Sequence, residues 1–141
     1  MQGILSFLKI LVSFLWEFPQ ILLGVIMFIV LKFQGKVKGI KTERQHIFVE
    51  TTDIGLSLGR VIFWNEIGGA QQCKNHEYGH AMQSKLLGPF YLFVVGIPSV
   101  CRFIYSNLYA KKHKVSWNGY FKGFPENWAD RLGGVNRNKM A

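Results

Sequence analysis

The sequence predicts a small α+β domain that follows apolar helices. Three observations predict this class. Residues 4–33 are almost continuously apolar, residues 46–66 contain two short runs rich in β-branched and aromatic residues, and residues 72–88 have a helical pattern. A chain of 141 residues has the length of one domain. We therefore predict membrane-anchoring helices within residues 1–34 and one folded domain over residues 35–141.

The composition limits the classes of partner. The net charge is +9, and 49% of the residues are hydrophobic. A basic surface suits nucleic acid or anionic lipid head groups. The apolar blocks favour lipid, and no nucleic-acid-binding module is recognisable, so we expect no nucleic acid partner. Cys73 and Cys101 lack CxxC spacing, which favours two unpaired thiols over a disulfide framework.

The N-terminal apolar block is too long for one straight span. A single helix over residues 4–33 would be about 45 Å long, whereas the hydrocarbon core is about 30 Å thick. Pro19 lacks an amide proton and disfavours helix at Phe18, so we expect a break there. The block is then either a hairpin of two short helices or an interfacial helix that leads into one tilted span. A buried hairpin in a soluble core is the alternative, and a cleaved signal peptide fits less well.

The segment after the apolar block is basic and then rich in strand-forming residues. Residues 32–44 carry a cluster of Lys and Arg, which indicates the cytoplasmic side of a membrane or a solvated charged run. The stretches "HIFVE" and "RVIFW" within residues 46–66 are separated by turn residues. They predict two strands, paired as a hairpin.

The stretch "NHEYGHAMQSKLLGP" covers residues 75–89. Residues 72–88 have a helical pattern, and Gly88 with the following proline predicts the end of this helix. His76 and His80 are four residues apart and so project from one face of that helix. Two imidazoles at this spacing can share one metal ion. Glu77 is rotated about 100° around the helix, where it can act as a general base on a metal-bound water.

A catalytic zinc site needs a third protein ligand. The other candidates are His46, His113 and the acidic residues. In "PENWADRLGG", Glu126 and Asp130 are also four residues apart, within a second helix that is predicted to begin at Pro125 and end at Gly133.

HExxH followed by ExxxD resembles the gluzincin zinc metallopeptidases, whose compact members, the minigluzincins, are similar to this chain in size. The resemblance implies a small zincin-like domain that binds Zn2+ and hydrolyses a peptide or protein substrate. It makes His76, His80 and Glu126 the metal ligands and Glu77 the general base. It makes Asp130 the carboxylate that holds the imidazole of the first histidine.

The residue that would stabilise the oxyanion is not fixed by a motif. Tyr105, Tyr109, His113 and Tyr120 are candidates, and Tyr120 and His113 are preferred; for each, a structural role is the alternative. The gluzincins also bind peptides along an exposed strand before the active-site helix. Residues 59–69 have the right order in the chain for that strand, or for an ordinary strand packed on the helix.

A shared zinc constrains the apolar segment at residues 87–105. If this segment crossed the membrane once, Glu126 would lie on the side opposite the histidines. We therefore expect an interfacial or shallow re-entrant segment with bends at Pro89, Gly96 and Pro98, or a segment in the soluble core. The basic clusters at residues 32–44 and 111–114 would then share the cytoplasmic face with the zinc.

The function expected from these residues is that of a membrane-associated zinc metallopeptidase of the metalloendopeptidase type. Glu77 would activate the zinc-bound water that attacks the peptide carbonyl. The alternatives are an intramembrane-type zinc protease, or a non-enzymatic basic membrane-interacting protein with incidental histidines. Cleavage specificity and oligomeric state stay open at this point.

Overall fold

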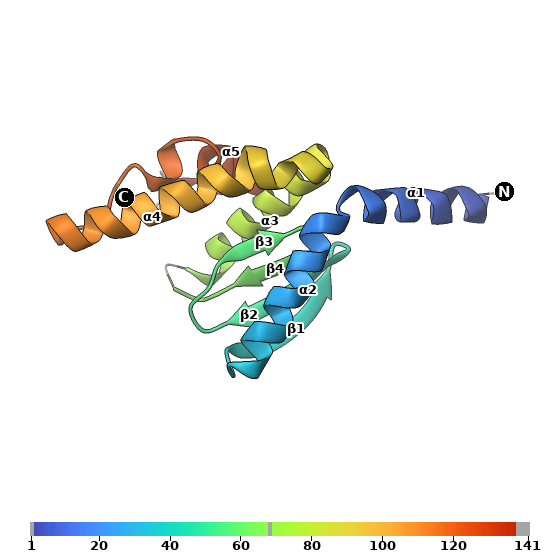
Figure 1. The fold of residues 1–141 in the computed structure, drawn as a ribbon, viewed down its shortest axis with the longest axis horizontal. Coiled ribbons are helices and arrows are strands. Elements are labelled where there is room, and N and C mark those ends of the chain that lie inside the picture. Colours follow the sequence, from blue (N-terminus) through green and yellow to red (C-terminus); the bar gives the residue numbers. More distant parts are fainter. Residues whose placement is uncertain (1, 68, 138–141) are drawn as a thin grey trace.

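A computed structural model describes residues 2–67 and 69–137 of the chain. It is α+β, as predicted: five α-helices accompany a mixed four-stranded sheet within these residues. Two helices sandwich the sheet (Figure 1). Helix α2 (Phe18–Phe33) contacts the face that carries Val61 and Phe63, and helix α3 (Ala70–Leu87) contacts the face that carries Ile62. Val61, Ile62 and Phe63 are consecutive residues of one short strand, and alternate residues of a strand point to opposite faces. Both faces of this strand are therefore buried.

The strands are β1 (Val37–Glu43), β2 (His46–Thr51), β3 (Leu56–Leu58) and β4 (Val61–Trp64), in the spatial order β1-β2-β4-β3. The predicted hairpin between the second and the fourth of these is wrong, because β2 and β4 are parallel neighbours. Each instead forms an antiparallel pair with a strand that the sequence did not predict: β2 pairs with β1, and β4 pairs with β3. The basic run after the apolar block therefore includes an edge strand.

The two N-terminal helices meet at a sharp bend. Helix α1 (Gln2–Trp16) and α2 enclose an angle of 71°, and the break lies at Glu17, two residues before the proline that predicted it. Helix α1 has no buried residue within its described length, so it extends from the domain as an apolar arm (Figure 1). The bend itself is docked on the end of α3: the Glu17 carboxylate accepts a hydrogen bond from Ser84, and the Trp16 indole donates to the carbonyl of Lys85.

Helix α5 (Glu126–Gly133) packs directly on α3, and glycines allow the close approach. A Cβ atom at Gly79 would lie 1.9 Å from the carbonyl oxygen of Ala129, and one at Gly133 would lie 2.0 Å from the carbonyl oxygen of Asn75. Since neither distance leaves room for a methyl group, the two backbones touch only because both positions are glycine. This contact brings the two helices that carry the predicted site together.

The apolar segment after α3 is continuous with a long helix. It forms a 3-10 turn (Gly88–Phe90) and a π-helical turn (Leu92–Gly96), and then α4 (Ile97–His113). The chain reverses direction at the 3-10 turn that contains Pro89, so α4 runs back beside α3 (Figure 1), whereas the helix Leu92–His113 continues through Gly96 and Pro98. The chain turns again after α4, where the guanidinium of Arg102 donates to the carbonyl of Tyr120. By length and composition, the helix Leu92–His113 could cross a membrane, and little of it is buried in the described structure.

Candidate metal centre

Three side chains predicted as ligands lie together between α3 and α5. One oxygen of Glu126, Oε2, is 3.0 Å from Nε2 of His76 and 3.1 Å from Nε2 of His80. The three potential ligand atoms all lie within 4.8 Å of one another, and all three residues are buried. Ligands about 2.0–2.1 Å from a tetrahedral zinc ion are roughly 3.3 Å apart. The spacing of this group therefore suits one ion of that size.

Hydrogen bonds define which ring nitrogens face the centre of the group. Nδ1 of His76 is 2.7 Å from the carboxylate of Asp130, which only accepts, so this nitrogen carries the proton. Nδ1 of His80 is 2.7 Å from Oε1 of Gln83, whose amide nitrogen donates to the carbonyl of Pro125. Because the amide oxygen of Gln83 accepts, His80 is also protonated at Nδ1. The Nε2 atoms of two neutral histidines are then both acceptors.

This donor set fits a cation. Two Nε2 lone pairs and a carboxylate oxygen face one another in a buried space, so protons or a metal ion must lie between them. Where protons do so, burial lowers the pKa of His76, but hydrogen bonds to Asp130 and Glu126 outweigh it and raise the pKa to about 9. Burial raises the pKa of the Glu126 carboxyl group, but the hydrogen bonds from His76 and His80 outweigh it, so the pKa is lowered. A Zn2+ ion supplies the same positive charge without these protons.

Glu77 lies beside this group and has a different environment. Its side chain is 7% exposed, and its Oε2 atom has no hydrogen-bond partner within the described part of the chain. Burial raises the pKa of its carboxyl group. A Cβ atom at Gly55 would lie 2.9 Å from Oε1 of Glu77, so the loop before β3 passes directly over the carboxylate. An unpaired carboxylate of raised pKa is suited to accept and return a proton.

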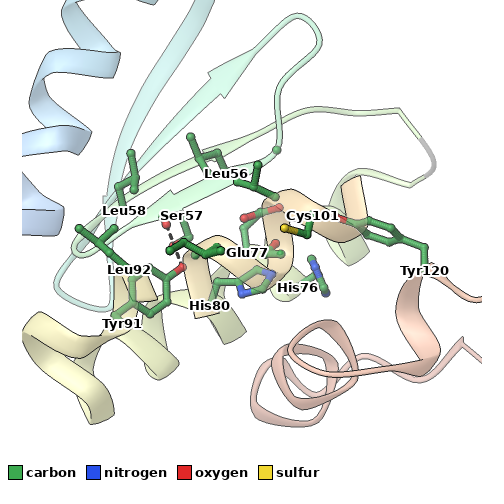
Figure 2. A pocket seen from close by; sticks show the side chains of 15 residues that line it. Leu56, Ser57, Leu58, His76, Glu77, His80, Tyr91, Leu92, Cys101 and Tyr120 are labelled. Carbon is green, nitrogen blue, oxygen red and sulfur yellow. Dashed lines mark hydrogen bonds between the residues drawn. The ribbon is translucent and has the colours of Figure 1, made fainter. Parts of the chain in front are cut away.

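A cavity of about 340 Å³ opens next to Glu77 and both histidines. Figure 2 shows these three side chains between β3 on one side and the residues after α3 on the other. Apolar side chains supply most of the remaining wall, among them Leu56, Leu92 and Val100, the last from α4. The volume lies within the range of small-molecule and peptide pockets.

The structure brings one of the two preferred oxyanion candidates to this cavity. Tyr120 lines it, and burial raises the pKa of its hydroxyl group, so this hydroxyl stays a donor. His113 is the last residue of α4, and its ring packs on Tyr109, away from the cavity lining. Tyr105 packs on Trp117.

Two supporting residues and one strand were not predicted from the sequence. Ser99 on α4 donates a 2.6 Å hydrogen bond to Oε1 of Glu126, the oxygen turned away from the histidines. The side-chain oxygen of Gln83 accepts a hydrogen bond from His80. The signal in the sequence was the position of Gln83 three residues after this histidine on the same helix. The strand beside the cavity is β3, at the sheet edge, and not the segment at residues 59–69, whose strand β4 lies inside the sheet.

No protein-family model, curated protein or solved structure matches this chain, so the function rests on the residues of the site.

Proposed function

We propose that the chain is a membrane-associated zinc metallopeptidase that hydrolyses peptide bonds. One observation carries the proposal: three buried acceptor atoms of His76, His80 and Glu126 converge, and Glu77 lies in the cavity that the two histidines line, with its Oε2 atom unpaired among the described residues. A structural metal site does not need a buried carboxylate without a partner. Hydrolysis does, because a base must take a proton from water and release it again.

The proposed reaction divides the work among named groups. A zinc ion held by the three ligands would polarise the peptide carbonyl and make a water molecule more acidic. Glu77 accepts a proton from the attacking water, whose oxygen bonds to the carbonyl carbon. The hydroxyl of Tyr120 donates to the carbonyl oxygen as its charge develops. When the C–N bond breaks, Glu77 returns the proton to the leaving amine, so one water is consumed for each bond cleaved.

Exposed apolar side chains support the membrane part of the proposal. They extend along α1, the outer face of α2, and α4. Residues 114–125, which return beside α4, include Lys114, Asn118 and Lys122. Apart from one 3-10 turn, the backbone of this segment is irregular, and irregular backbone exposed to lipid is costly in hydrocarbon. We therefore place α1 and α4 along the interface, on the cytoplasmic face, with the basic clusters against anionic head groups.

The decisive experiment compares wild type with Glu77→Gln and Glu126→Ala, each purified in detergent. Glu77→Gln is expected to keep one zinc per chain and to lose peptide cleavage by several orders of magnitude. Glu126→Ala is expected to lose most of its zinc, because a ligand is gone. Equal zinc content in wild type and Glu126→Ala, or equal cleavage by wild type and Glu77→Gln, would refute the proposal.

The length of Leu92–His113 favours a second candidate, an intramembrane-type zinc protease. In that case α4 crosses the bilayer, and His113 lies on the opposite side from Lys38, which follows the N-terminal helices. Labelling of a His113→Cys chain, with Cys73 and Cys101 replaced by Ser, separates the two. In sealed vesicles, an impermeant reagent that labels residue 113 and a cysteine at Lys38 from the same side supports the interfacial arrangement.

A further inference from the structure

The edge of β3 beside the cavity offers few backbone groups to a peptide. Ser57 pairs with Ile62, between the pairs that join Leu56 to Phe63 and Leu58 to Val61. In an antiparallel pair, alternate residues turn their backbone groups away from the partner strand. The carbonyl of Ser57 is one of these outward groups, and it is already occupied: the buried hydroxyl of Tyr91 donates to it at 3.1 Å (dashed in Figure 2).

Beyond Ser57, helix α2 covers the strand. A Cβ atom at Gly24 of α2 would lie 3.0 Å from the carbonyl oxygen of Leu58. Gly59 is buried against the first turns of α2, where a Cβ atom would lie 2.9 Å from Ile21. A bound peptide therefore cannot continue along the edge in this direction.

The edge is open in the other direction. Gly55, two residues before Ser57, is exposed and lies over Glu77, and Asp53 before it is also exposed. The site thus has a closed end at Tyr91 and an open end beyond Gly55. At about 3.4 Å per residue, the interval between Gly55 and Ser57 has room for about two residues of an added strand.

We propose that Tyr91 and α2 close the peptide-binding edge, so that the site removes one or two residues from the amino terminus of a peptide. The inference rests on the proposed peptidase function. An added strand that runs antiparallel to β3 points its amino terminus toward Leu58, the closed end. The bond over Glu77 then has a short amino-terminal part and a carboxyl-terminal part that leaves past Gly55.

The chemistry of the closed end indicates which amino-terminal residues fit. Leu58, Tyr91 and Leu92 line it, and Glu77 is the only acidic residue among those that line the described cavity. No further carboxylate is therefore in place to select a free ammonium group. The substrate class is a peptide with apolar first residues, and an acetylated amino terminus is accepted as well as a free one.

The test uses the zinc-loaded full chain and one ten-residue peptide with apolar first residues. The peptide is presented free, joined through its carboxyl end to a folded carrier, or joined through its amino end to the same carrier. The first two are expected to lose one or two amino-terminal residues, as seen by mass spectrometry, at similar kcat/KM. The third is expected to react slower by about two orders of magnitude, because its reactive bond cannot reach Glu77.

The outcomes distinguish the two proposals. The amino-terminal assignment is overturned if both carrier fusions are cleaved equally, or if cleavage is lost only when the carrier is joined to the carboxyl end of the peptide. In either case the Glu77-dependent peptidase stands. Cleavage of none of the three, or cleavage that persists in Glu77→Gln, overturns the proposed function itself.

Substitution of Tyr91 adds a structural control. Tyr91→Ala removes the ring and the hydroxyl that close the edge, so longer amino-terminal products are expected, with faster cleavage of the amino-terminal fusion. Tyr91→Phe keeps the ring and should keep the products short. Zinc content reports whether each variant is folded. If Tyr91→Ala does not retain zinc, the comparison of the two fusions with wild type still decides the inference.

Discussion

Nδ1 of His80 lies 2.7 Å from the side-chain oxygen of Gln83, and the amide nitrogen of the same glutamine donates to the carbonyl of Pro125 at 3.0 Å. One buried side chain therefore joins His80 to the turn that precedes Glu126. This link fixes the ring nitrogen of His80 that faces Glu126 and the start of α5 at the same time.

Gln83→Leu is expected to lower zinc affinity by about 10- to 100-fold, because the histidine loses the partner that orients its ring. Competition with a chelator measures the affinity. Gln71→Leu, at an exposed position on the same helix, is the matched control and should leave the affinity unchanged. Equal affinities for wild type and Gln83→Leu would show that His80 is oriented without Gln83.

Gly79→Ala is expected to separate α5 from α3 and so to disrupt the metal centre. The new methyl group would meet the carbonyl of Ala129, a backbone group that cannot rotate away. Lower thermal stability and loss of zinc should occur together. Gly3→Ala, where a Cβ atom meets nothing within 4 Å, is the control. Full zinc content in Gly79→Ala would mean that the helices can separate without loss of the centre.

His46 predicts one component of the pH dependence of stability. Burial lowers its pKa in the folded chain, and the hydrogen bond with the carbonyl of Arg44 only partly opposes this. The unfolded chain therefore binds a proton at His46 near pH 6.5 that the folded chain does not yet bind. Stability from this residue is present above that pH and is lost as the pH falls toward the folded pKa.

Chemical unfolding at pH 7.5 and pH 5.5 tests this sign. The free energy of unfolding should fall less between the two values in His46→Gln than in wild type, because glutamine does not titrate. A larger fall in the variant would contradict the direction of the shift. The comparison isolates His46 from His76 and His80, which are common to both chains.

We predict that lipid binding depends on the apolar side chains of α1 and not on charge alone. Phe7 and Ile10 on α1 are 64% and 60% exposed. Phe7→Glu with Ile10→Glu is expected to reduce flotation with anionic vesicles by at least about tenfold, since each buried side chain contributes roughly 1.5–3 kcal/mol. Gln2→Glu with Ser6→Glu changes the charge equally without removing apolar surface, and should have a smaller effect. Equal effects would assign the binding to charge alone.

The parts of the fold that depend on nearby residues were accessible from the sequence. The spacing of His76 and His80 lies within one helix, and the end of that helix at Gly88 follows from the glycine and the proline after it. The meeting of Glu126 with the histidines came from resemblance to a family and not from the spacing alone. Its structural basis is the backbone contact at Gly79, which no periodic pattern encodes.

The parts that depend on distant pairing were not accessible. Strand β3 has three residues, too few for an alternating pattern, and β1 lies in a run of lysines that resembled a solvated segment. Because β1 pairs with one edge of β2 and β3 pairs with one edge of β4, the remaining edges of β2 and β4 face each other, and these two strands are parallel. Ser99 was missed for the same reason: its partner, Glu126, is 27 residues away, and nothing local marks that serine among other helix residues.

The bend at Glu17 is held to the end of the helix that carries the two histidines, through Ser84 and the indole of Trp16. The arm and α3 are therefore joined at this end of the helix. On a bilayer, this connection would hold the mouth of the cavity at a constant height above the lipid. Under the proposed function, protein tails that emerge from the same membrane would then be trimmed at a set distance from it, which the geometry of the bend determines.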